Sequence, residues 1–181
     1  MGKWDRFVYA KAEKLLHEVK RLLNGKKKGV WVFMNFEIKS FNELTVDDMY
    51  EIAKARFEVF VCEQKITCEQ DFDDKDKKCH HVFLKDNDRI VAYSRIVPKG
   101  LGYDYISIGR VLVLESHRRK GIAQEMIRAC LEFIKNKLDE NTVVLSAQLY
   151  VKDLYQSVGF KAISDVYDEA EIPHVKMKIE L

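Results

Sequence analysis

The feature that most limits what this chain can fold into is a strand that leads through a basic turn into a long helix. Residues 105–114 are mostly apolar, which is typical of a buried strand. The turn Arg118-Arg119-Lys120-Gly121 follows without a long linker. Beyond it, apolar residues recur at three- and four-residue steps and predict one buried helix face: Ala123, Met126, Ile127, Cys130, Leu131, Ile134 and Leu138. Because such a helix packs on the sheet that contains the strand, the chain is predicted to be an α/β protein.

The rest of the chain extends this unit into a mixed sheet. Thr45 followed by Asp48 resembles a capping box and predicts the start of a helix. The turn at residues 86–88, Asp-Asn-Asp, predicts a hairpin between the strands on either side. A short helix is expected at 151–158, and the expected strands are 33–41, 81–85, 89–97, 105–114, 142–147, 159 onward and 174–181. This order predicts a mixed sheet with helices on its faces.

Residues 1–33 are predicted to form an appendage to a domain at residues 34–181. The appendage carries a net charge of +6 and the rest of the chain a net charge of −4. Its apolar residues lie on one helical stripe: Trp4, Val8, Ala12, Leu15, Val19 and Leu22. A basic amphipathic helix can bind a membrane surface or a partner, but we favour packing on its own domain or on a second copy in a homodimer. A lysine–glycine–valine tract before Met34 is what a ribosome-binding sequence read in frame would encode. This suggests the hypothesis that the native start is Met34 and that residues 1–33 are translated upstream sequence.

The composition narrows the function classes. Apolar residues make up 47% of the chain and charged residues 33%, as in ordinary globular proteins. No apolar run approaches the roughly 20 residues that span a bilayer, and the start lacks a secretory signal, so a cytoplasmic protein with no membrane partner is expected. The excess of basic residues belongs to residues 1–33, which argues against a nucleic acid partner for the domain. The four cysteines are too few and too irregularly spaced for a disulfide framework: Cys62, Cys68, Cys79 and Cys130. A metal site is not expected either, because they include no C-x-x-C pair.

The turn at residues 118–123 has the chemistry of an anion site. The first N–H groups of a helix lack intrahelical partners, and the helix dipole favours negative charge beside them. Gly121 would let a phosphate approach the backbone where a side chain would block it. Arg118, Arg119 and Lys120 add positive charge. Taken alone, the same turn is also compatible with solvated basic side chains on a surface.

Two stretches resemble signatures of the GNAT superfamily of acyl-CoA N-acyltransferases. Arg118-x-x-Gly121-x-Ala123 matches (Arg/Gln)-x-x-Gly-x-(Gly/Ala), and it lies at the family's place between the fourth strand and the long helix. Residues 154–160, Leu-Tyr-Gln-Ser-Val-Gly-Phe, match the family's Leu-Tyr-x-x-x-Gly-Phe. Two motifs in this order are far more specific than either one alone.

More narrowly, residues 34–181 resemble the ElaA-like branch of this superfamily. The stretches that carry this resemblance are 56, 59–64, 70–73, 81, 91–96, 108–111, 147–148 and 172–174. One departure is the start of the short helix, Val151-Lys152-Asp153, which lacks the asparagine that many relatives place there. This departure puts a side-chain contact with pantetheine at that point in doubt.

The resemblance implies a mixed, mostly antiparallel GNAT-like sheet of about six to seven strands flanked by helices. It also implies an N-acetyltransferase that moves an acetyl group from acetyl-CoA directly to a primary amine, on a small molecule or a peptide, without a metal. In the family, the turn's amides hold the CoA pyrophosphate and the preceding strand binds pantetheine. The implied cofactor residues are Leu112, Val113, Leu114, Arg118, Arg119, Lys120, Gly121, Ile122 and Ala123. Tyr155 occupies the place of a tyrosine that can act as general acid; a packing tyrosine is the alternative.

The acceptor amine needs a group that takes its proton, because an amine with a pKa of about 10.4 is almost fully protonated at neutral pH. The candidates are Glu63, Glu69, Asp71, Asp73, His81 and His174. Glu63 is preferred because it follows an apolar helix end, whereas His81, which alternates with apolar Phe83, is equally compatible with a core histidine. The acids at 58–76 are interpreted as a mouth that attracts a cationic amine, or else as a solvated loop. A backbone N–H near Val113 is expected to donate to the thioester oxygen.

Arg56 interrupts the apolar stripe of the helix that begins after Thr45. A buried unpaired charge costs several kcal/mol, so this arginine is expected either to pair with a carboxylate or to extend its charged end to solvent.

A second function class also fits the turn. A non-catalytic acyl-CoA-binding regulatory domain would keep the glycine turn but would tolerate the loss of Tyr155. The presence of Tyr155 therefore argues mildly for the enzyme.

Overall fold

A mixed sheet of eight strands forms the centre of the fold of residues 34–181. These are the residues that this computed structural model describes. The predicted amphipathic segment at residues 1–33 lies outside the described residues. The strands are β1 (Glu37–Ser40), β2 (His80–Asp86), β3 (Arg89–Val97), β4 (Ile106–Val113), β5 (Thr142–Gln148), β6 (Lys161–Ala162), β7 (Tyr167–Glu169) and β8 (Ile172–Glu180). The helical segments are η1 (Phe41–Glu43), α2 (Val46–Arg56), η2 (Phe57–Glu63), η3 (Lys75–Lys78), η4 (Glu115–His117), α3 (Ile122–Lys137), η5 (Leu149–Val151) and α4 (Lys152–Gln156). Within residues 34–181, none of these helices is both long and apolar enough to cross a membrane.

The strands follow the order β1-β2-β3-β4-β5-β8-β6 across the sheet, and β7 pairs with β8. Neighbouring strands are antiparallel except for β4 and β5, which are parallel. The prediction of a mixed, mostly antiparallel α/β sheet is therefore confirmed. The strand β7 is not among the predicted elements, and it turns into β8 at Ala170 and Glu171 with φ angles of 51° and 61°. Tight hairpin turns of this kind usually carry asparagine or glycine, so this one left no signal in the sequence.

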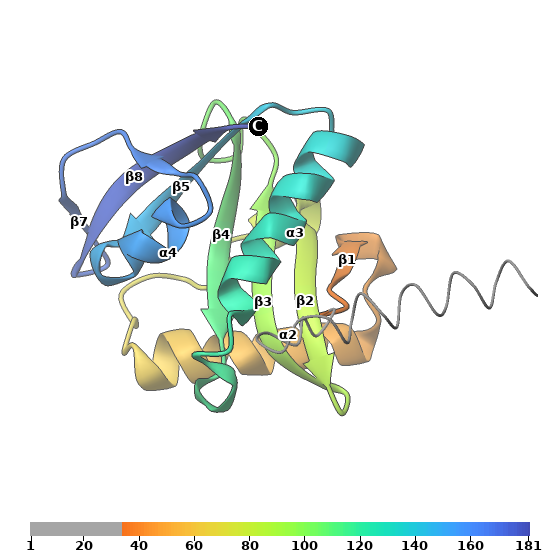
Figure 1. The fold of residues 1–181 in the computed structure, drawn as a ribbon. Helices are drawn as coiled ribbons and strands as arrows, with labels where there is room; N and C mark the ends of the chain where they lie inside the picture. Colours follow the sequence, from red (N-terminus) through yellow and green to blue (C-terminus); the bar gives the residue numbers. More distant parts are fainter. Residues whose placement is uncertain (1–33) are drawn as a thin grey trace, which may run out of the picture. The chain divides into compact units, whose positions relative to one another are not determined.

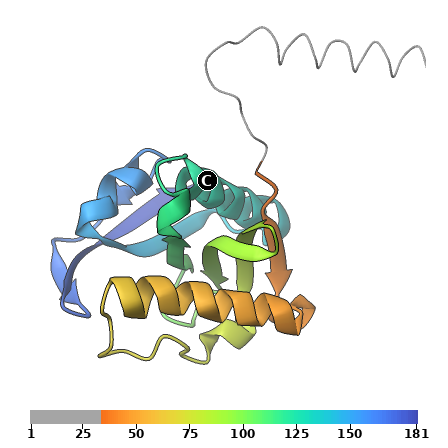
Figure 2. The same ribbon diagram turned by 90° about the horizontal axis from the view of Figure 1, so that it is seen from below.

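The central strands of the sheet lie between two helices, α3 and α2 (Figures 1 and 2). Val82 and Ala92 belong to the apolar cluster around α3, whereas their neighbours Phe83 and Tyr93 belong to the cluster around α2. Because successive side chains of a strand point to opposite faces, α3 and α2 cover opposite faces of the sheet. The helix α4 shares the side of α3, where its Tyr155 is part of the same cluster.

The helix α2 begins at the predicted capping box. The Thr45 side chain accepts a hydrogen bond from the Asp48 N–H at 3.0 Å, and the Asp48 carboxylate accepts one from the Thr45 N–H at 3.0 Å. These two bonds satisfy N–H groups at the helix end. The chain continues from α2 into the π-type turns of η2, and Figure 2 shows both as one long helix beneath the sheet. Because the combined helix is long, Glu63 and Gln64 at its end lie near strands β4 and β5.

The strands β4 and β5 pair over two residues and then separate. The pairs are Ile106 with Val143 and Ser107 with Val144. Figure 1 shows the two strands diverging beyond this point. Backbone groups on the open side of β4 after residue 107 therefore have no strand partner. Since α3 follows the carboxyl end of β4 and α4 follows that of β5, the starts of both helices lie near this opening.

Candidate active site

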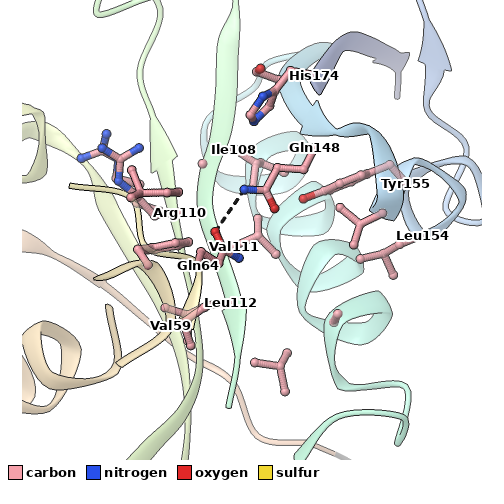
Figure 3. Close-up of a pocket in the computed structure, with 18 of the residues that line it drawn as sticks. Val59, Gln64, Ile108, Arg110, Val111, Leu112, Gln148, Leu154, Tyr155 and His174 are labelled. Atoms are coloured by element: carbon pink, nitrogen blue, oxygen red, sulfur yellow. Dashed lines mark hydrogen bonds between the residues drawn. The ribbon is translucent and has the colours of Figure 1, made fainter. Parts of the chain in front are cut away.

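A cavity of about 920 Å³ occupies the opening between β4 and β5 (Figure 3). Residues 107–113 of β4 form one wall, and Ser146 and Gln148 of β5 belong to the other. The turn before α3 lines one end, and α4 contributes Leu154 and Tyr155. This volume lies in the upper part of the usual range of ligand pockets, so the opening has room for a substantial ligand.

The turn before α3 presents free N–H groups and positive charge to this cavity. Gly121 has a φ of 79°, a left-handed conformation that glycine adopts without strain, and it caps α3. The Glu125 N–H donates to the Gly121 carbonyl at 3.1 Å, which leaves the N–H groups of residues 121–124 without helix partners. Arg119 also lines the cavity. This end of the cavity is therefore suited to an anion such as a phosphate.

The edge of β4 that faces the opening carries free backbone donors. The Leu114 N–H donates to the Val91 carbonyl at 2.9 Å, on the side of β3. The Val113 carbonyl accepts a hydrogen bond from Arg118 Nε at 2.8 Å, on the edge of β4 that faces away from β3. Because the backbone groups of a strand alternate between its two edges, the N–H groups of Val113 and Val111 point into the opening.

A β-bulge at Arg110 bends this wall of the cavity. Tyr93 pairs with Leu112 and Arg95 with Gly109, so β4 has one residue more than β3 between these pairs. Arg110 lies within the bulge with a φ of 54°, and its side chain lines the cavity. Bulges redirect side chains at functional sites, but a left-handed arginine has no cue in the sequence. Arg110 is therefore absent from the predicted site residues.

Known proteins resemble this chain in fold and in sequence. A family model described as the acetyltransferase (GNAT) domain matches residues 39–181. The chain belongs to the GNAT acetyltransferase family. UPF0039 protein C11D3.02c of Schizosaccharomyces pombe is 41% identical over 150 residues, which cover 82% of this chain and 98% of that protein. The crystal structure of Escherichia coli ElaA is 34% identical and aligns with a TM-score of 0.74 over 81% of this chain and 99% of ElaA. An acyl-CoA N-acyltransferase from Pseudomonas aeruginosa is 30% identical, with a TM-score of 0.73 over 80% of this chain and 98% of that one.

These matches confirm the resemblance to GNAT proteins and to ElaA. They support acyl transfer from an acyl-CoA as the general chemistry of this domain.

Most of the cofactor residues predicted for the GNAT domain line the cavity: Leu112, Val113, Arg118, Arg119, Gly121, Ile122 and Ala123. Leu114 and Lys120 do not. Leu114 is buried in the cluster around α2, and its N–H is bonded to β3. The Lys120 ammonium donates to the Ser116 carbonyl at 3.0 Å. Cofactor contacts at Leu114 and Lys120 therefore stay predictions, and the geometry supports them less than it supports the residues of the cavity wall.

An ion pair between Arg118 and Glu63 ties the turn to the end of the α2–η2 helix. The two terminal nitrogens of Arg118 donate to the two Glu63 oxygens at 2.7 Å each, while its Nε holds the Val113 carbonyl. Both side chains are partly exposed, at 36% and 42%, so the pair contributes modestly to stability. Its geometry instead fixes the turn against β4. The role of Glu63 as proton acceptor stays a prediction, and both of its oxygens already have a partner.

Tyr155 stands on the cavity wall with an exposed fraction of only 6%. Its ring packs edge-on against Phe160, with ring centres 6.0 Å apart and an interplanar angle of 78°. Figure 3 shows its hydroxyl pointing toward Gln148. Burial raises the pKa of Tyr155 above its ordinary value, so the hydroxyl keeps its proton in the neutral range. The position of the Tyr155 hydroxyl suits a proton donor. The contact of its ring with Phe160 also fits the alternative of a purely structural tyrosine.

The acidic stretch before β2 contains the partners of Arg56. This arginine is fully buried and donates to Asp71 at 2.9 Å and to Asp76 at 2.8 Å. Its guanidinium lies 4.2 Å from the centre of the Phe72 ring. Of the two alternatives for Arg56, pairing with carboxylates is thus confirmed.

Two further arginines neutralise acids of the same stretch. Arg95 donates to both oxygens of Asp73 at 2.7 and 2.6 Å, and Arg110 donates to Asp71 at 2.7 Å. Burial alone would raise the pKa of Asp73, but the hydrogen bonds and charge of Arg95 and the charge of Arg110 hold it well below its ordinary value. The interpretation as an attracting acidic mouth is therefore wrong for these two aspartates. They form a salt-bridged wall, while Glu69 remains an exposed acid of the cavity.

Arg56→Gln is expected to lower the free energy of unfolding by about 3–5 kcal/mol, because Asp71 and Asp76 would lose a partner inside the protein. Urea unfolding measures this change. The control is Arg89→Gln, which removes an ion pair with Glu58 of 2.6 Å between side chains that are 46% and 45% exposed. That pair should contribute less than about 1 kcal/mol. An equally small loss in Arg56→Gln would contradict the buried network.

His81 lies outside the cavity wall. It is fully buried, its Nε2 donates to the Asp76 carbonyl at 3.0 Å, and its Nδ1 lies 2.9 Å from the Tyr93 hydroxyl. Because a carbonyl only accepts, Nε2 carries a proton, and burial lowers the pKa of His81 so that the ring stays neutral. The geometry favours the core-histidine alternative. Within residues 34–181, no histidine, cysteine and acidic side chains gather in a group that could hold a metal ion.

A polar bridge across the opening was missed by the sequence analysis. Gln148 Nε2 donates to Gln64 Oε1 at 3.1 Å, the dashed line in Figure 3, and the Tyr150 hydroxyl donates to Gln148 Oε1 at 2.6 Å. The bridge joins the end of β5 to the end of η2. Gln64 and Gln148 lie 84 residues apart in the chain, so only the folded structure pairs them.

Proposed function

We propose that this domain transfers the acetyl group of acetyl-CoA to a primary amine by direct attack within a ternary complex. The observation that carries the proposal is that one cavity contains both the free N–H end of α3 and the buried hydroxyl of Tyr155. Membership in the GNAT family supports the acyl-CoA donor, and the choice of acetyl rests on the name of that family. The proposal assigns the enzyme to the cytoplasm.

In this proposal the CoA pyrophosphate binds at residues 118–123, where the helix N–H groups and Arg119 favour negative charge. The pantetheine arm runs along the open edge of β4. The N–H groups of Val111 and Val113 are its backbone donors, and one of them donates to the thioester oxygen as negative charge develops there.

The reaction begins when the ammonium of the acceptor loses one proton and the neutral amine attacks the thioester carbon. The carbon–sulfur bond of the tetrahedral intermediate then breaks, and Tyr155 donates its proton to the departing thiolate. The second amine proton, lost as the amide forms, restores Tyr155. The products are the N-acetyl amine and CoA, with one proton released to solvent.

The test is amine-dependent release of CoA from acetyl-CoA, followed together with the mass of the acetylated product. The samples are the full chain and a chain that starts at Met34, because the match to the GNAT domain covers residues 39–181. The acceptors are a panel of alkylamines, polyamines, amino acid amides and peptides. Both samples should release CoA with at least one amine. Saturable acetyl-CoA binding without release would favour the regulatory alternative, and loss of soluble folded protein in the shorter chain would show that residues 1–33 belong to the fold.

A further inference from the structure

We propose that His174 is the group that removes the proton from the acceptor amine, with the lone pair of its Nε2. This inference rests on the proposed transferase function and adds the residue that makes the amine nucleophilic. The geometry that carries it is a cavity-lining imidazole whose other nitrogen is fixed by the backbone.

The backbone sets the tautomer of His174. Its Nδ1 lies 2.7 Å from the Ile172 carbonyl, and because a carbonyl only accepts, Nδ1 carries the proton. In the neutral ring Nε2 therefore holds a lone pair. The residue is 7% exposed and lines the cavity, and in Figure 3 its imidazole lies among the cavity side chains beside β4. It is the cross-strand partner of Gln148, the residue toward which the Tyr155 hydroxyl points.

The other candidates have partners that occupy the atoms a base would need. Both oxygens of Glu63 accept from Arg118, and Asp71 and Asp73 are held by arginines. The ring nitrogens of His117, also in the cavity wall, lie 2.9 Å from the Ser116 hydroxyl and 3.1 Å from Asp86. Glu69 lines the cavity but is exposed to solvent, unlike the buried ring of His174.

The charged and titratable groups around His174 come from three segments. Tyr167 of β7 stacks on its ring, with centres 6.2 Å apart and planes at 29°. Glu169 of β7 and Tyr103 line the same cavity. The ammonium of Lys176 lies over the rings of Tyr103 and Tyr167, at 5.9 and 5.8 Å.

In the proton transfer, one N–H bond of the ammonium breaks and an Nε2–H bond forms on His174, directly or through one water. The imidazolium later returns this proton to solvent. Since Tyr155 supplies the thiolate proton separately, acid and base are different residues of the same cavity.

The test compares the parent with His174→Asn, whose amide nitrogen can replace Nδ1 as the donor to Ile172. Initial rates at pH 7 are measured with ethylamine, glycinamide and trifluoroethylamine, whose ammonium ions are successively more acidic. Loss of a general base should lower kcat/KM with ethylamine about a hundredfold to ten-thousandfold. The loss should shrink along the series, because trifluoroethylamine is already neutral at pH 7, and it should also shrink as the pH rises. Acetyl-CoA affinity should stay unchanged.

His80→Asn is the matched control. His80 packs against Phe133 with ring centres 5.0 Å apart and is not part of the cavity wall, so its rates should equal those of the parent. If the parent acetylates amines and His174→Asn loses activity equally with all three, or keeps it, the base assignment is overturned while the transferase function stands. If the parent binds acetyl-CoA and acetylates no amine, the transferase function itself fails.

A second measurement on the parent protects the test against a variant that does not fold. Diethyl pyrocarbonate reacts with imidazoles that are unprotonated and accessible. Peptide mass mapping should find His174 modified, in step with the loss of activity, and His81 unmodified. An unmodified His174 would overturn the proposal.

Discussion

Tyr155→Phe is expected to lower kcat about a hundredfold to ten-thousandfold, the usual effect of removing a positioned acid, while acetyl-CoA affinity stays nearly unchanged. The variant keeps the ring, which packs 6.0 Å from Phe160, and loses only the hydroxyl that faces the cavity. The departing thiolate would then have to take its proton from water. Single-turnover kinetics measures this step when product release limits the steady state.

The loss in Tyr155→Phe should be the same from pH 6 to pH 9. Burial raises the pKa of Tyr155 above the ordinary value of about 10, and a raised pKa means that the protonated form persists to higher pH. The parent therefore keeps its proton donor throughout this range. If the rate of the parent fell below pH 9 because Tyr155 lost its proton, the pKa of Tyr155 would have to be lowered. That result would contradict the effect of burial.

Tyr150→Phe is the matched control for this prediction, because Tyr150 also lines the cavity. Its hydroxyl donates a hydrogen bond to Gln148 at 2.6 Å and accepts a long one from Gln64 at 3.4 Å. The loss of the short bond is worth about 0.5–1.5 kcal/mol, so the variant should lose no more than roughly tenfold in rate. If Tyr155→Phe matches the parent across pH 6 to 9 in single-turnover experiments, the residue is a packing tyrosine.

The sequence predicts those parts of the fold and of the cavity wall that lie within short stretches of chain. The turn at residues 118–123 and the stretch at 154–160 can be recognised because each element follows directly from the one before it. The capping box of α2 is equally local, since Thr45 and Asp48 are three residues apart. Helix periodicity and strand alternation add the order of the elements, which sets the fold class. The local pattern therefore predicts the sheet, its helices and the cofactor turn.

The parts that the sequence does not predict depend on residues that are distant in the chain. Arg56 stands out as a charge in an apolar stripe, which predicts a need for partners but not which carboxylates supply them. A count of acids between residues 58 and 76 likewise suggests an open acidic mouth, because it cannot include the arginines that arrive from β3 and β4. Glu63 and Arg118 are 55 residues apart, and only the folded sheet brings them together.

Gly121→Asp is expected to weaken acetyl-CoA binding by more than about a hundredfold. The substitution puts a carboxylate at the end of the cavity where the phosphates belong in the proposed complex, and like charges held together cost several kcal/mol. It also places a side chain at a φ of 79°, which costs roughly 1 kcal/mol of folding stability. Calorimetric titration with CoA measures the affinity, and thermal unfolding measures the stability.

Two further variants separate the charge from the strain of the backbone. Gly100→Asp adds the same side chain at a φ of 85°, in a turn outside the cavity wall. A new Cβ would have no neighbour within 4 Å at either glycine. It should lose similar stability and keep full affinity. Gly121→Ala adds a Cβ that meets no protein atom within 4 Å, so any loss of affinity in this folded variant reports the close approach of the ligand to the backbone. A Gly121→Asp protein that folds and binds CoA as tightly as the parent would show that the pyrophosphate does not occupy the turn before α3.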